Sequence, residues 1–207
     1  MKRTATGAVF AHSPARGACP AFLVLLMVLL CLTGGGAFAA SAPEADRPSD
    51  WARPVELPGS DNFYQVSDEL YRAAQPDDNA MAAYDAYGIR TIINLRGFHS
   101  DKDEVKGTKL ILVEIPVHTW KAGDDKVAVA ALQAIRDAEK PVLVHCQHGA
   151  DRTGLVIAMY RIVEQGWTRE KALEELRNGG YGYHSIWRNI PEYLESVNID
   201  AVRRALR

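Results

Sequence analysis

Residues 141–154 read PVLVHCQHGADRTG, and this stretch determines the fold. Residues 141–144 are apolar and largely β-branched, as expected of a short buried strand. Residues 153–164 (TGLVIAMYRIVE) predict a mostly apolar helix, which Gly166 ends. A strand that leads through a short loop into a buried helix is typical of a protein with a parallel sheet covered by helices.

The rest of the folded region continues this alternation of strands and helices. Apolar runs predict strands over residues 62–66, 70–72, 89–95 and 110–117, with the first two at an edge of the sheet. Apolar spacing and capping residues predict helices over residues 79–87, 126–138 and 169–178, and one or two more after Pro191. The expected fold class is α/β, with a central, mostly parallel sheet flanked by helices in one small domain.

The first 39 residues have the pattern of a secretory signal peptide. Lys2 and Arg3 precede an apolar run at residues 21–32, and glycines and small residues (GGGAFAA) follow it. We therefore expect cleavage after Ala39 and a periplasmic or secreted protein. The apolar run is shorter than the roughly 20 residues that span a bilayer. An uncleaved membrane anchor and a lipoprotein modified at Cys31 are the weaker alternatives.

Composition limits the remaining functions. Residues 40–60 contain four prolines and predict a linker, so the folded domain is expected at residues 61–207. A net charge of −2 argues against a nucleic-acid partner held through phosphates. The sequence holds no GxxxxGK[ST], HExxH or paired CxxC motif, so neither a nucleotide site nor a metal site is predicted. We expect no cofactor, and contact with a membrane only through an uncleaved signal segment.

The loop after the strand at residues 141–144 has the properties of an anion site. Its backbone N–H groups can turn inward ahead of the next helix, whose dipole also favours an anion. Gly149 permits the tight turn, and Arg152 offers a planar fork for two oxygens. Cys146 would lie on the floor of this cradle, where the same donors stabilise a thiolate, and the Thr153 hydroxyl can donate to that thiolate or to a leaving group. A thiolate below a bound phosphate favours in-line attack on phosphorus through a phosphocysteine.

The residues from His145 to Thr153 match the signature H-C-x5-R-[S/T], and the chain resembles the Cys-dependent protein tyrosine and dual-specificity phosphatases. LYRAAQP at residues 70–76 and IINLR at residues 92–96 extend the likeness to compact secreted bacterial members, over about residues 62–185. The resemblance implies a small dual-specificity-phosphatase-like domain with Cys146 as nucleophile and Arg152 as phosphate clamp. It assigns the cradle backbone to Gln147, His148, Gly149, Ala150 and Asp151.

His145 is expected to orient this loop by hydrogen bonding, with a purely structural role as the alternative. The substrate implied is a phosphorylated protein, with inositol phosphates or another small phosphorylated compound as an alternative. A phosphate-binding pseudo-phosphatase is the third possibility.

The proton donor for the leaving group is the least determined residue. In the family an Asp supplies it from the loop before the helix that leads to the cysteine strand. Here that loop is residues 116–125 (PVHTWKAGDD), and its carboxylates are Asp124 and Asp125. We favour Asp124, then Asp125, although one of them is expected to cap the next helix. His118, or no residue of this loop, remains the alternative.

Overall fold

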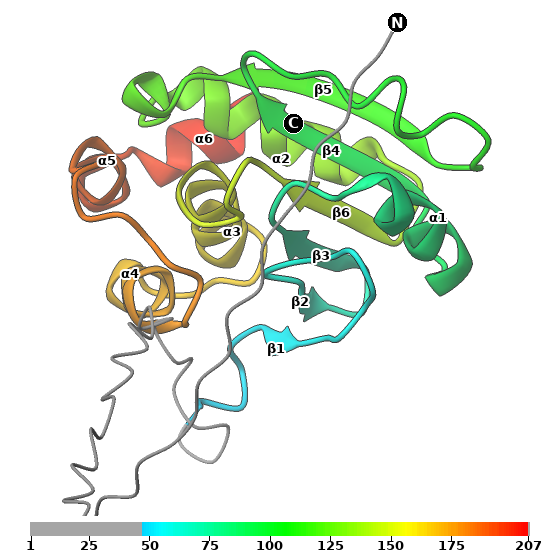
Figure 1. The fold of residues 1–207 in the computed structure, drawn as a ribbon. Helices are drawn as coiled ribbons and strands as arrows, with labels where there is room; N and C mark the ends of the chain where they lie inside the picture. The colour runs from blue at the N-terminus through cyan, green and yellow to red at the C-terminus, as the bar shows by residue number, and fades with distance from the viewer. Residues whose placement is uncertain (1–46, 207) are drawn as a thin grey trace, which may run out of the picture. The chain divides into compact units, whose positions relative to one another are not determined.

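The computed structural model describes residues 47–206 (Figure 1). Six strands form one sheet in the order β1-β2-β3-β6-β4-β5. Strands β3, β6, β4 and β5 are parallel, and β1 and β2 add an antiparallel edge. The strands are β1 (Arg53–Pro54), β2 (Tyr64–Ser67), β3 (Leu70–Ala73), β4 (Thr91–Arg96), β5 (Ile111–Val117) and β6 (Val142–His145).

Helices cover both faces of this sheet (Figure 1). The helix α1 packs Ala80, Met81 and Tyr84 against Ile92 and Leu143 on one face. The larger core lies on the other face, where the helices from α2 to α6 pack against alternate residues of β4 and β6. The helices are α1 (Asp78–Tyr87), α2 (Asp125–Asp137), α3 (Asp151–Val163), α4 (Arg169–Asn178), α5 (Asn189–Ser196) and α6 (Ile199–Ala205), with a short 3-10 turn η2 (Thr119–Lys121).

The strand register brings the ends of three strands to one place. His145 on β6 pairs with Ala73 on β3 and with Asn94 on β4. Because parallel strands end at the same edge of a sheet, the loops that follow β3, β4 and β6 lie side by side. The loop from residue 146 to residue 150 therefore has the segments after Ala73 and after Asn94 as neighbours.

The fold class predicted from the sequence is confirmed by this sheet. The strand at residues 70–72, expected at an edge, is an interior strand, because β3 pairs with both β2 and β6. The helix after the cysteine loop begins at Asp151, two residues earlier than expected.

Residues 47–60, which the sequence predicts as part of a linker, make ordered contacts with the rest of the domain. Arg47 donates hydrogen bonds to Ala52, to Gly179 and to the Tyr181 hydroxyl, each at 2.8 Å. Ala52 has no exposed surface, and Arg53 begins the edge strand β1. Glu175, which is buried and paired with Arg161, accepts from the N–H of Ala52, and the guanidinium of Arg47 lies over the rings of Trp51, Tyr64 and Tyr181. Residues 47–60 therefore pack as part of the folded domain in spite of their prolines.

The predicted signal peptide lies outside the described residues. Among residues 47–206, no helix is long and apolar enough to cross a membrane.

Candidate active site

The loop between β6 and α3 is held by its carbonyl groups. The carbonyl of Gln147 accepts from the backbone N–H of Gln75 at 3.1 Å. The next two carbonyls accept from side chains, that of His148 from Asn62 Nδ2 at 2.8 Å and that of Gly149 from Arg72 Nη2 at 2.6 Å. Three successive carbonyls thus bond to groups outside the loop. The N–H groups of residues 147–150 form no hydrogen bond with the described residues, so they remain available for a ligand.

Gly149 is required where the loop turns. Its φ of +67° lies in the left-handed region, and a Cβ placed there would come within 2.5 Å of the carbonyl oxygen of Ala73. A side chain would therefore be strained and would also push the loop off the end of β3. The loop forms a nest of N–H groups at the N-terminus of α3, which is the arrangement that binds tetrahedral anions.

Cys146, Arg152 and Thr153 surround this nest. Cys146 follows β6 directly and is 1% exposed. Two donors beside it have no hydrogen-bond partner among the described residues, namely Nε of Arg152 and the buried hydroxyl of Thr153. The Arg152 Nη1 lies 3.4 Å from the carbonyl of Val117, beyond the end of β5. Unpaired buried donors are costly unless a ligand satisfies them, so these groups also point to an anion.

A buried imidazole–carboxylate pair lies behind the cysteine. Nε2 of His145 is 2.7 Å from Oδ2 of Asp101, and Nδ1 of His145 lies 3.3 Å from the carbonyl of Cys146. Gln75 donates to the other oxygen of Asp101 at 2.8 Å. Burial raises the pKa of Asp101, but the hydrogen bond and charge of His145, followed by Gln75 and His99, outweigh burial and hold that pKa below its usual range.

A second buried cation lies beneath the loop. Arg72 on β3 is 1% exposed, donates to Gly149, and stacks its guanidinium 3.5 Å from the centre of the Tyr181 ring. Burial lowers the pKa of Arg72, while Tyr181, Glu175 and Cys146 oppose that effect. This arginine holds the loop in place and adds positive charge near Cys146.

A pocket of about 200 Å³ opens in front of Arg152 and Gln147. Its walls come from the ends of β4 and β5 and from the segment before α5. The ten lining residues are Arg96, Gly97, Phe98, Val117, His118, Thr119, Trp120, Gln147, Arg152 and Trp187. None of these ten, all within the described part of the chain, carries a carboxylate. Phe98 is 85% exposed and Trp120 is 57% exposed, so the rim of the pocket is aromatic.

Comparison with known proteins agrees with this geometry. Residues 48–186 match the family described as DSP-PTPase phosphatase fused to NAD+ kinase. The chain is 35% identical over 188 residues to the dual specificity protein phosphatase TpbA of Pseudomonas aeruginosa, which covers 89% of this chain and 84% of TpbA.

The chain belongs to the dual-specificity protein phosphatase family.

Solved structures support the same assignment. The crystal structure of P. aeruginosa TpbA matches this phosphatase with a TM-score of 0.70 and 34% identity, covering 77% of this chain and 98% of that one. A cysteine-to-serine variant of TpbA in complex with phosphotyrosine matches with a TM-score of 0.70 and 33% identity, at the same coverage. The catalytic core of the yeast PP-IP phosphatase Siw14, at 20% identity and a TM-score of 0.61, shares the fold.

The two aspartates favoured as proton donor lie outside the pocket of this phosphatase. Asp124 caps α2, where its side chain accepts from the N–H of Lys126 at 2.7 Å. Asp125 is exposed and accepts from the hydroxyl of Tyr193 at 2.9 Å. Capping a helix orients a carboxylate toward its own backbone. This geometry argues against either aspartate as the group that protonates a leaving oxygen.

The side chain of His148 is exposed, whereas that of Asp151 is buried beside His184. The Asp151 carboxylate accepts from the N–H of His184 at 3.0 Å and lies 2.9 Å from its ring Nδ1. Ligand atoms of the three side chains lie within 4.8 Å of one another. The hydrogen bonds between His184 and Asp151 account for this closeness, so we assign no metal to it.

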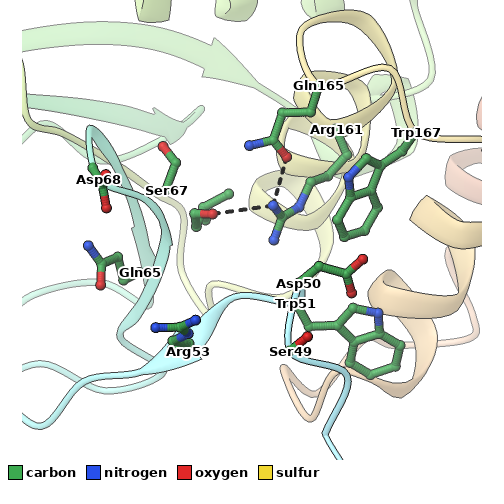
Figure 2. Close-up of a pocket in the computed structure, with 11 residues that line it drawn as sticks. Ser49, Asp50, Trp51, Arg53, Gln65, Ser67, Asp68, Arg161, Gln165 and Trp167 are labelled. Carbon is green, nitrogen blue, oxygen red and sulfur yellow. Dashed lines mark hydrogen bonds between the residues drawn. The ribbon is translucent and has the colours of Figure 1, made fainter.

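The phosphatase also has a larger pocket, of about 450 Å³, between β2 and α3 (Figure 2). This pocket is lined by the turn between β2 and β3, which lies at the N-terminal end of β3. The cysteine loop lies at the opposite end, beyond the C-terminal end of β3. Of the two arginines that line the pocket, Arg53 is exposed and Arg161 is fully engaged: Figure 2 shows the bond of Arg161 to Gln165, and it also binds Val66 and Glu175. This pocket is separate from the cradle.

Sequence reasoning missed Asp101. Arg72 ends a predicted strand, and the sequence leaves two interpretations of it open, an added positive charge near the cradle or a surface ion pair. Asp101 lies in a run of charges, HSDKDE, where nothing distinguishes a buried carboxylate from solvated ones. The position of Arg72 one residue before the end of a strand was a usable signal, because strand ends surround sites in parallel sheets.

Proposed function

We propose that this chain is an exported phosphatase that hydrolyses phosphotyrosine in proteins through a phosphocysteine at Cys146. The observation that supports it most is the loop of residues 147–150, whose carbonyls are bonded outward while its N–H groups, Arg152 Nε and the Thr153 hydroxyl have no partner among the described residues. These donors match the three equatorial oxygens of a phosphoryl group in the transition state.

The proposed reaction has two steps. The thiolate of Cys146 attacks phosphorus in line, the bond from phosphorus to the ester oxygen breaks, and the alcohol or phenol leaves with a proton. Water then attacks the phosphocysteine, the sulfur–phosphorus bond breaks, and inorganic phosphate and the thiolate are released. Arg152 and the loop N–H groups neutralise the charge on the transferring oxygens in both steps.

The preference for an aromatic phosphate rests on the pocket walls. Phe98, Trp120 and Trp187 line them, and the ring of Trp120 is available to pack against a substrate ring. Only two of the ten lining residues, Arg96 and Arg152, carry a permanent positive charge. Arg72 adds charge beneath the loop but is engaged by Gly149 and Tyr181, so an inositol polyphosphate, with several phosphates to neutralise, is the weaker candidate.

Export is proposed from residues 1–39 alone, with their basic start, apolar run and A-x-A ending. The test is to express the full chain in a Gram-negative host, separate periplasm from cytoplasm, and determine the N-terminus of the product. A periplasmic product that begins at Ala40 supports export with cleavage. A full-length membrane-bound product would identify an uncleaved anchor, and a full-length cytoplasmic one would contradict export.

The enzymatic proposal is tested with Cys146→Ser and a panel of phosphotyrosine peptides, phosphoserine peptides and inositol phosphates. Wild type should release phosphate fastest from phosphotyrosine peptides. When the peptide carries a radioactive phosphate and the reaction is quenched rapidly, the radioactive phosphoryl group should be found on Cys146. Cys146→Ser should bind the same peptides without turnover. Full hydrolysis by Cys146→Ser would overturn the mechanism, and binding without turnover by wild type would identify a pseudo-phosphatase.

A further inference from the structure

The proposed reaction requires a proton for the leaving oxygen, and the pocket offers one group that can supply it. We propose that His118 is the general acid of this phosphatase. The proposal rests on the proposed function and names the residue that completes its first step. None of the ten residues lining the pocket has a carboxylate, and His118 is the one among them of a residue type that commonly acts as a general acid in enzymes.

Aromatic contacts fix the position of the His118 ring. It stacks on Trp120 with ring centres 4.7 Å apart and an angle of 6°, and Phe98 covers it at 4.6 Å. On a third side it lies against Gly97, where a Cβ would come within 2.7 Å of the ring. These three contacts hold the His118 ring in one orientation at the pocket wall.

The backbone around His118 is also anchored. Its carbonyl accepts from the N–H of Lys121 at 2.8 Å, which closes the turn η2. Asn189, at the start of α5, donates to the carbonyl of Thr119 at 2.9 Å. The preceding residue, Val117, has its carbonyl 3.4 Å from Arg152 Nη1. His118 is therefore adjacent in sequence to the residue that touches the phosphate clamp, on an anchored turn.

The other titratable groups near the cradle have different positions or chemistry. Arg96, from β4, and Arg152, from α3, are the charged groups that share the pocket with His118, and a guanidinium does not release its proton in proteins. His145 is completely buried beside Asp101, and His184 is paired with Asp151 at the rim. Lys121, on the same turn as His118, is exposed and does not line the pocket.

Proton transfers at His118 balance both steps. As the ester bond breaks, the imidazolium of His118 gives its proton to the departing oxygen and becomes neutral. In the second step the neutral imidazole takes a proton from the attacking water, and hydroxide oxygen bonds to phosphorus as the cysteine leaves. His118 ends as the imidazolium with which it began.

The test compares leaving groups in His118→Gln and His118→Asn. General acid catalysis matters most when the leaving oxygen is a strong base, so kcat/KM on phenyl phosphate, which reports the first step alone, should fall roughly a hundredfold or more. On para-nitrophenyl phosphate, whose phenolate leaves readily, the loss should be under about tenfold. Retained activity on the second substrate also shows that the variants are folded.

Two controls separate this role from others. Asp125→Asn removes an exposed carboxylate outside the pocket and should leave both rates unchanged. Trp120→Phe alters the pocket wall without removing the imidazole and should change KM but not the dependence on leaving group. Equal losses on both substrates in both His118 variants, or no loss on either, would overturn the role of His118. Activity of Cys146→Ser would instead overturn the proposed function itself.

Discussion

Nε2 of His145 lies 2.7 Å from Oδ2 of Asp101, and neither side chain has any exposed surface. This pair connects the cysteine loop to the pocket wall. Asp101 also accepts from Gln75, whose side-chain oxygen accepts from Arg96 at 3.0 Å. A carboxylate from the β4–β5 connection thus orients the imidazole that lies against the Cys146 carbonyl, in the way a buried acid orients a histidine in other active sites.

The first prediction concerns the pH dependence of stability in Asp101→Asn. Because the folded pKa of Asp101 is below that of the unfolded chain, its carboxylate stabilises the fold above about pH 4, and this contribution is lost as the pH falls through the folded pKa. Urea unfolding at pH 7 should show the variant less stable by about 1–3 kcal/mol, with the difference shrinking below about pH 4. Lys106 lowers the pKa of the exposed Asp103 in the same direction, but solvent screens that pair, so Asp103→Asn should show a much smaller difference. A gap independent of pH would contradict the role given to the Asp101 carboxylate.

The second prediction concerns the Thr153 hydroxyl, which is buried with no partner among residues 47–206. Thr153→Val keeps the shape and removes this donor, so kcat should fall roughly a hundredfold while KM changes little. Thr153→Ser retains the hydroxyl and should recover most of that loss. Steady-state kinetics on a phosphotyrosine peptide provide the measurement. Equal losses in Val and Ser variants would indicate that packing, not hydrogen bonding, is the role of this residue.

The third prediction compares two glycines with the same backbone conformation. Gly149 and Gly182 have φ of +67° and +76°, but only Gly149 has backbone atoms close to where a Cβ would lie. Gly182→Ala should lower the free energy of unfolding by roughly 1–2 kcal/mol, the cost of a side chain in the left-handed region. Activity should be retained. Gly149→Ala adds the collision with Ala73 and should reduce kcat/KM at least about tenfold, since loop geometry sets transition-state contacts. Similar activities in the two variants would show that the loop tolerates displacement.

The fourth prediction concerns the ion pair of Arg161 and Glu175, with both side chains 3% exposed and two contacts at 2.8 and 2.9 Å. The same carboxylate accepts from the N–H of Ala52 at 2.7 Å and so holds residues 47–60 in place. Glu175→Ala leaves the buried guanidinium of Arg161 without its carboxylate and should destabilise the fold by about 3–5 kcal/mol.

A matched exposed pair provides the control for this prediction. Arg177 and Glu195 are about half exposed, and Glu195→Gln should cost about 0–1 kcal/mol. Chemical denaturation followed by fluorescence measures both variants. A similar small cost for Glu175→Ala would mean that the N-terminal segment does not depend on this carboxylate.

The sequence by itself determined the fold class and the loop that carries the chemistry. Residues 141–154 specify a strand, a tight glycine turn and a helix through local properties, namely β-branched side chains, a glycine and an apolar run. The spacing of Cys146 and Arg152 is likewise local, so the sequence alone predicts the cradle.

Only the tertiary structure decided what surrounds that loop. The pairing of β3 and β4 with β6 brings Arg72, Asp101 and the ring of His118 from distant segments to one edge of the sheet. Asp124 caps a helix, whereas Asp101 is buried beside an imidazole. Which of these positions a carboxylate takes depends on long-range packing, and a local sequence pattern does not predict it. For the same reason residues 47–60, proline-rich in sequence, become part of the domain through long-range contacts, among them those of Arg47 with Gly179 and Tyr181 and that of Ala52 with the buried Glu175.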